Sequence, residues 1–124
     1  MGMHTGHRQH LGRLGERLAA EHFSRLGFEV LAQNHHTRWG ELDLVLSDGR
    51  TLVFCEVKTR RLGSGEPFES LHGAKRSQVR RIAALWLTEP SERPWHEQLR
   101  FDAVGVLVDR QDGLVRLDHF ENAF

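Results

Sequence analysis

Two runs of alternating residues, at residues 40–46 and 52–58, flank an Asp-Gly dipeptide. Alternation of apolar and polar side chains is typical of β-strands, and Asp-Gly is a strong signal for a short hairpin turn, so residues 40–58 predict a β-hairpin. Burying a carboxylate is unfavourable unless a partner compensates for the lost water. The charged residues within these two strands therefore indicate a site, and they are Glu41, Asp43, Glu56 and Lys58.

The length of the turn decides whether these acids can act together. Side chains change face at every residue of a strand, so a change of one residue in register moves an acid to the other face. With the Asp-Gly pair as the turn, Asp43 lies diagonal to Glu56 on one face, within about 7–8 Å, and Glu41 lies directly opposite Glu56. An odd-numbered turn would separate Asp43 from Glu56 unless a bulge intervened. A shared acidic site therefore predicts an even number of turn residues.

The acidic face of this hairpin is expected to need a cation. Carboxylates a few ångströms apart raise each other's pKa unless a positive charge neutralises them. Mg²⁺ binds one or two protein carboxylates and keeps positions for water and phosphate oxygens, so Mg²⁺ (or Mn²⁺) is the expected cofactor, held by Asp43 and Glu56. Lys58 could orient the attacking water or stabilise the charge that develops on phosphate. These three residues form a candidate phosphodiesterase centre.

A plainer interpretation is that Glu56 and Lys58 face water on a half-exposed strand, where ion pairs contribute little to stability. The rest of the strand argues against it, because residues 52–55 and Val57 are apolar on both faces. Such a strand is central in its sheet and covered on both sides. We therefore expect the acid and the lysine to line a cleft at the end of a covered strand.

The order of elements predicts the fold class. Residues 11–26 carry leucines at helical spacing before Gly27, and residues 73–88 predict a second helix with an apolar stripe. Strands are expected at residues 28–34, in the hairpin, at residues 99–108 and at residues 113–120. This order predicts an α/β fold with a mixed β-sheet flanked by helices. The 124 residues fit one domain, at residues 11–124, after a flexible N-terminus at residues 1–10.

Composition narrows the class of protein. No apolar run approaches the roughly 20 residues of a membrane helix, and the single cysteine excludes an intrachain disulfide, so we expect a cytoplasmic protein with no membrane partner. Lys+Arg and Asp+Glu both number 17, which weighs against a large basic surface but allows a local one. With one cysteine and no HExxH motif, the nine histidines do not indicate a zinc site.

The wider pattern resembles a known nuclease core. Asp43, then twelve residues, then Glu56-Val57-Lys58 is similar to the acid-acid-lysine motif of the PD-(D/E)xK nucleases. The segments GERLAAEHFSRLGFEVLAQN, GELDLV, LVFCEVKTRR and RFDAVGV, with a basic helix before the last, resemble the YraN-like family of bacterial proteins from about Leu11 to Val108. The resemblance implies a restriction-endonuclease-like core, similar in fold to archaeal Holliday junction resolvases.

The resemblance also implies an activity and further site residues. It implies a metal-dependent DNA endonuclease, structure-specific in repair or recombination, whose helix-borne acid Glu16 joins Asp43 and Glu56 at the metal. Glu16 could equally be a solvated glutamate that pairs with a neighbouring arginine. Glu41 could be a further ligand, or it could hold the ammonium group of Lys58.

A nucleic-acid partner, most simply DNA, would contact basic side chains near the acids. Lys75 lies at the start of the second helix, on its buried side, and could reach phosphate in the cleft. Trp39 could stack on a base or pack against the domain. Arginines at the end of the second hairpin strand and on the helix, which carries no acids beside them, are candidate backbone contacts: Arg60, Arg61, Arg76, Arg80 and Arg81.

Two other functions remain open. A nucleic-acid-binding module with this fold could lack turnover, although clustered acids repel phosphate and have no use in a pure binder. A protein-interaction scaffold would suit the neutral charge, but it leaves the acids unexplained. If the chain is a nuclease, a single site cuts one strand, and a symmetric homodimer would more easily cut both.

Overall fold

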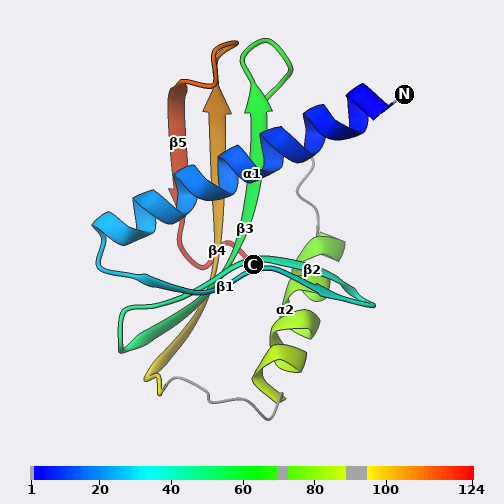
Figure 1. Cartoon of the computed structure of the whole chain (residues 1–124). Coiled ribbons are helices and arrows are strands. Elements are labelled where there is room, and N and C mark those ends of the chain that lie inside the picture. The colour runs from blue at the N-terminus through cyan, green and yellow to red at the C-terminus, as the bar shows by residue number, and fades with distance from the viewer. Residues whose placement is uncertain (1, 70–72, 89–94) are drawn as a thin grey trace.

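A single mixed sheet lies between two helices in the computed structural model, which describes residues 2–69, 73–88 and 95–124 (Figure 1). The strands lie in chain order, with β3 and β4 parallel and all other neighbours antiparallel. This confirms the predicted α/β class and is compatible with a restriction-endonuclease-like core. The elements are α1 (Gly2–Arg25), β1 (Glu29–Thr37), β2 (Gly40–Ser47), β3 (Thr51–Arg61), α2 (Gly73–Thr88), β4 (Gln98–Val108) and β5 (Leu114–Phe120).

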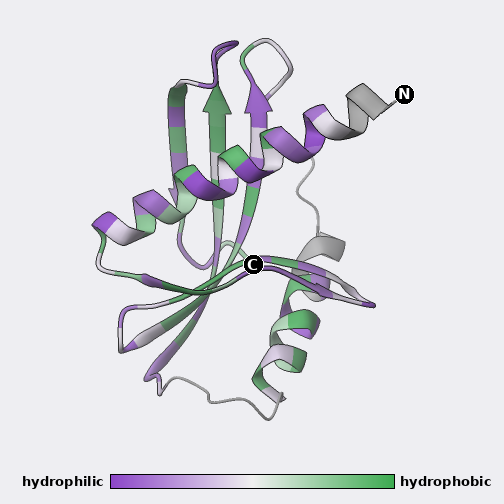
Figure 2. Ribbon diagram, in the orientation of Figure 1, coloured by the Kyte–Doolittle hydropathy of each residue, from purple (hydrophilic) through white to green (hydrophobic). Residues whose placement is uncertain are grey.

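The central strand β3 packs against a different helix on each face. Cys55 belongs to a core that includes Phe23 of α1, whereas Phe54 belongs to a second core that includes Ile82 of α2. Residues 51–57 are all buried, which confirms the prediction of a central strand covered on both sides. Figure 2 shows that the last part of β3 is hydrophilic beside the hydrophobic end of β4. The strand therefore carries charge where it leaves the core.

The turn between β2 and β3 has an even number of residues, as predicted, but it lies one residue further along the chain. The N–H of Asp48 donates to the carbonyl oxygen of Thr51 at 3.3 Å, so Gly49 and Arg50 form the turn. Gly49 has a φ of 96°, a conformation that glycine adopts without a steric penalty. The Asp48 side chain also accepts the N–H of Thr51 at 2.7 Å, which fixes Asp48 at the strand end.

This register leads the chain toward the two predicted acids, which lie close enough for the charge of Glu56 to act on Asp43. The last paired residues of β2 and β3 are Leu44 and Cys55. Continued by one residue, the register puts Asp43 directly opposite Glu56, instead of diagonal to it. The inferred proximity of the two acids therefore follows from the observed turn.

Several element ends differ from the sequence-based prediction. Helix α1 begins at Gly2, nine residues before the predicted start of the helix at residue 11. Nε2 of His10 lies 2.7 Å from Oδ2 of Asp112 in the β4–β5 turn, a long-range contact that supports the extension. Strand β1 continues to Thr37, where we expected a loop from residue 35, because its end pairs with the start of β2. Neither described helix is long and apolar enough to cross a membrane.

Candidate metal centre

The Asp43 carboxylate lies where β2 and β3 separate. Beyond the pair of Leu44 and Cys55, the N–H of Val57 donates to Oδ2 of Asp43 at 2.8 Å. The side chain thus takes the place of a backbone carbonyl as the acceptor for β3. This bond holds one carboxylate oxygen in a fixed position at the end of the ladder.

Three acids from two elements meet at this point. Carboxylate oxygens of Glu16 in α1 and of Glu41 and Asp43 in β2 lie within 4.8 Å of one another, and all three side chains are half-buried. They border a pocket of about 410 Å³. The pocket is lined by Gln9, Gly12, Arg13, Glu16, Asn34, His36, Glu41 and Asp43.

Close approach of α1 to β3 positions Glu16. Gly15, the residue before it, is buried against the side chain of Thr59, and a Cβ atom on Gly15 would overlap that side chain. Figure 1 shows α1 crossing β3 at this level of the sheet. The absent side chain lets the helix lie against the strand, so that the next residue can reach the acids of β2.

The crowding of these acids disfavours their charged forms. Burial and then the charge of Glu56 raise the pKa of Asp43 to about 8, although the hydrogen bond from Val57 opposes the shift. Burial also raises the pKa of Glu16, with a smaller contribution from Glu41, while a hydrogen bond with Asn34 lowers it. Without a cation, Asp43 therefore keeps its proton at neutral pH.

The donor set suits a hard divalent cation. Carboxylate oxygens are the ligands that Mg²⁺ and Mn²⁺ prefer, and Mg²⁺ keeps several waters when it binds protein. A pocket of about 410 Å³ has room for those waters beside the three acids. A bound cation would also offset the charge of Glu56, which together with burial keeps Asp43 protonated.

The predicted acid-lysine pair lies beside this group. Glu56 is only 4% exposed, and its Oε1 lies 3.5 Å from Nζ of Lys58, which is 34% exposed. Glu56 is outside the group of three acids, but its charge raises the pKa of both Asp43 and Glu16. The four predicted acids thus lie near one another. Glu41, which the sequence suggested only as a possible further ligand, belongs to the group of three, whereas Glu56 lies beside that group.

The predicted arginine contacts divide into two kinds. Nη1 of Arg61 donates to the carbonyl oxygen of Asp109 at 2.6 Å and to Oδ1 of Asp112 at 3.0 Å, so Arg61 stabilises the β4–β5 turn. Nη2 of Arg80 donates to the carbonyl oxygen of Phe124 at 2.5 Å. These two guanidinium groups have structural roles.

The other predicted basic residues do not show such a role. Arg60 is half-buried and borders a second pocket with Arg8, and Arg81 is exposed over the ring of Trp39. The side chains of Lys75 and Arg76 lie outside the described residues.

Two pocket residues were not identified from the sequence. Asn34 is the last residue of the expected strand and His36 lies in the part of β1 beyond it, and both line the acidic pocket. Nδ1 of His36 lies 3.7 Å from Oε2 of Glu41. Had the strand been extended to residue 37, its alternation would have placed these two polar side chains on one face.

The buried acid of β4 has a structural role. Asp102 is fully buried and accepts hydrogen bonds from the guanidinium group of Arg100, with the shortest contact at 2.9 Å. Nε2 of His119 lies 2.7 Å from its Oδ2. The negative charge is therefore balanced within the sheet, away from the acidic pocket.

Comparisons with known proteins assign the chain to a family. It matches uncharacterised protein family UPF0102 over residues 15–106. UPF0102 proteins of Acidothermus cellulolyticus and Nocardia farcinica are each 46% identical to it, over 115 residues (86% of this chain, 87% of the relative) and 121 residues (97% and 93%). A relative from Frankia casuarinae is 48% identical over 119 residues, or 92% of this chain and 95% of the relative. The chain therefore belongs to the UPF0102 family, the YraN-like family that its sequence resembles.

Proposed function

We propose that this protein is a metal-dependent endonuclease that hydrolyses phosphodiester bonds in DNA. The proposal rests on the meeting of Glu16, Glu41 and Asp43 in one pocket, close to the buried Glu56 and its partly exposed partner Lys58. A purely structural role does not explain why several acids gather in one place. Four acids this close together, from α1, β2 and β3, oppose folding unless a cation compensates for their burial and repulsion.

The acids would hold Mg²⁺ or Mn²⁺. Glu16, Glu41 and Asp43 would supply oxygen ligands, with Glu56 close enough to assist through its charge or through a water. When bound, such an ion polarises a phosphate and lowers the pKa of bound water. The bond from Val57 to Asp43 keeps one ligand fixed, which reduces the cost of assembling the site.

Lys58 would act on the phosphate. Its ammonium group is partly exposed and lies 3.5 Å from the Glu56 carboxylate, which holds it at the rim of the site. A fixed positive charge at this place would stabilise the negative charge that develops on the phosphate oxygens, or orient the attacking water by a hydrogen bond. Lys58 is therefore the proposed catalytic residue of the chain beside the metal ligands.

DNA would reach the site across local basic groups, because the whole chain has no net charge. Arg60 and Arg81 are the preferred backbone contacts among the arginines whose side chains are described, since Arg61 and Arg80 already bind carbonyl oxygens of the protein. Contacts through Lys75 and Arg76, and a homodimer that would cut both strands, remain predictions.

A cleavage assay tests this function. Labelled single-stranded, duplex, flap and four-way-junction DNAs would be incubated with Mg²⁺ or Mn²⁺ and with the wild type, Asp43→Asn or Lys58→Met. Glu29→Gln, which changes an exposed acid at the far end of β1, is the matched control. We expect metal-dependent cleavage by the wild type and by the control alone. Equal cleavage by all proteins would identify a contaminant, and DNA binding without any cleavage would favour the non-catalytic module.

A further inference from the structure

A basic and aromatic cluster lies at the tip of the β1–β2 hairpin, against α2. We define this hairpin-tip cluster as Arg38 and Trp39 of the turn together with Arg81 of α2. The guanidinium carbons of Arg38 and Arg81 lie 4.8 and 5.1 Å from the centre of the Trp39 ring, and the Trp39 side chain is 39% exposed. Figure 1 shows the hairpin extending over α2 to the edge of the molecule.

The backbone of the turn is fixed from both sides. The N–H of Trp39 donates to Oγ1 of Thr37 at 3.1 Å, and its carbonyl oxygen accepts a hydrogen bond from Nε2 of Gln78 at 2.5 Å. Gly40 has a φ of 133°, and a Cβ atom there would collide with the Gln78 side chain. The backbone that carries the indole ring is therefore fixed at the surface, which lowers the entropy cost of binding a ligand on the ring.

The charges of this cluster are not balanced by acids. Within the described residues, neither Arg38 nor Arg81 forms a salt bridge, and their contact at this tip is the Trp39 ring. Two exposed cations on an exposed indole suit a ligand with negative charge and a flat aromatic face. An unpaired nucleotide has both, because its base can stack on indole or guanidinium planes while its phosphate meets the arginines.

The position of the cluster connects it to the acids. Glu41, one of the three clustered acids, lies two residues after Trp39, and His36 on the other strand of the same hairpin lines the acidic pocket. We propose that Trp39, with Arg38 and Arg81, binds an unpaired base next to the phosphate that enters the pocket. The inference rests on the proposed function and names its substrate class: DNA with unpaired nucleotides, as in single strands, flaps or branch points, in preference to blunt duplex.

The test measures binding without metal, so it does not depend on cleavage. Fluorescence anisotropy would report binding of a labelled single strand, a flap duplex and a blunt duplex in EDTA. We expect Trp39→Ala to weaken binding of the single strand and the flap by about 5- to 150-fold, the range for loss of one stacked base, and to change blunt-duplex binding much less. Trp39→Phe should restore most of the affinity.

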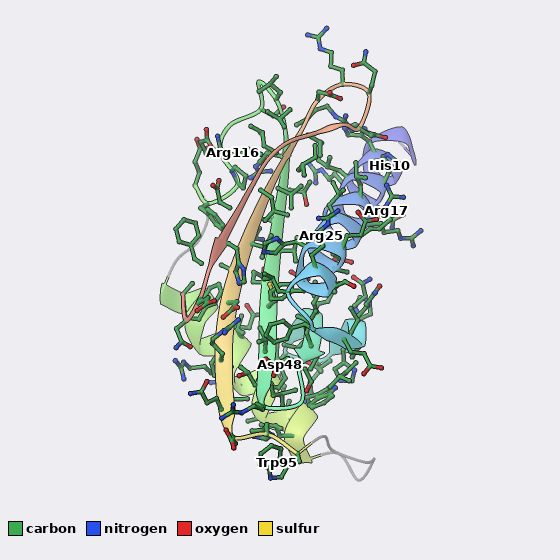
Figure 3. The ribbon with its side chains drawn as sticks, turned by 90° about the vertical axis from the view of Figure 1, so that its left-hand side faces the viewer. His10, Arg17, Arg25, Asp48, Trp95 and Arg116 are labelled. Atoms are coloured by element: carbon green, nitrogen blue, oxygen red, sulfur yellow. The ribbon has the colours of Figure 1, made fainter. Side chains whose placement is uncertain are left out.

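Two further variants separate stacking from charge and from general surface effects. Trp95→Ala removes a tryptophan that is 65% exposed at the opposite end of the molecule from His10 (Figure 3), and it should leave all affinities unchanged. Arg81→Gln should weaken binding to every DNA and reduce its salt dependence. Unchanged affinity in Trp39→Ala, or an equal loss on blunt duplex, would overturn the inference. Selective binding without cleavage in the metal assay would instead overturn only the proposed nuclease activity.

Discussion

The clustered acids should make the metal-free protein less stable as the pH rises. Asp43 has a pKa of about 8 in the folded chain against an ordinary value of 3.8, so between these values the folded state holds a proton that the unfolded state has released. The free energy of unfolding therefore falls over this range and levels off above it. Four pKa units correspond to about 6 kcal/mol, an upper limit because the chain can relax around the charge.

The variant Asp43→Asn isolates this effect. Asparagine keeps an oxygen that can accept the N–H of Val57, but it removes the charge that Glu56, Glu16 and Glu41 oppose. Urea unfolding followed by tryptophan fluorescence, in EDTA and at several pH values, would give the free energy of unfolding. We expect the variant to be more stable than the wild type by several kcal/mol at about pH 9, and by much less at about pH 5.

The control for this experiment is Glu29→Gln, which changes an exposed carboxylate and should follow the wild-type profile. Parallel profiles for the wild type and Asp43→Asn would refute the reasoning, because they would mean that Asp43 is charged at no cost in the folded chain. Added Mn²⁺ should narrow the difference at about pH 8, since an ion that binds only the folded wild type stabilises it by about 3 kcal/mol at 100-fold excess over its dissociation constant.

Three further substitutions test separate parts of the account. Gly15→Ala should destabilise the protein by about 1–3 kcal/mol in urea unfolding and weaken Mn²⁺ binding, because α1 must move away from β3. The control is Gly12→Ala in the same helix, where no atom lies within 4 Å of the new Cβ, and it should be neutral or stabilising. Asp102→Asn should cost about 3–5 kcal/mol, because it breaks the buried ion pair with Arg100 and leaves that guanidinium group with the exposed Glu121, but Mn²⁺ affinity measured by calorimetry should not change. Lys58→Met should abolish DNA cleavage in a gel assay while Mn²⁺ binding persists, and cleavage at the wild-type rate would contradict the role given to the lysine.

Local patterns predicted most of the fold. The helix over residues 73–88 matches α2 at both ends, and the two C-terminal strands match β4 and β5 within one residue. The even-numbered turn could be derived because strand alternation ties the turn length to the faces of Asp43 and Glu56. These features depend on residues close together in the chain.

Features that depend on distant contacts could not be predicted. The extension of α1 to Gly2 accompanies the contact between His10 and Asp112, which lie 102 residues apart. Arg61 resembled a DNA contact in the sequence, but its guanidinium binds the β4–β5 turn, a partner that only the folded chain brings near. The place of Glu41 in the acidic group likewise depends on how α1 crosses the sheet.

The central claim is that the acids of the hairpin and of α1 form one site for a divalent ion. Titration of Mn²⁺ at neutral pH, followed by electron paramagnetic resonance of the free ion, tests it most directly for the wild type, Glu16→Gln, Glu41→Gln and Asp43→Asn. We expect saturable binding by the wild type and by Glu29→Gln, and strong loss in each of the three acid variants. Failure of the wild type to bind Mn²⁺, with or without DNA, or unchanged binding in the acid variants, would contradict it.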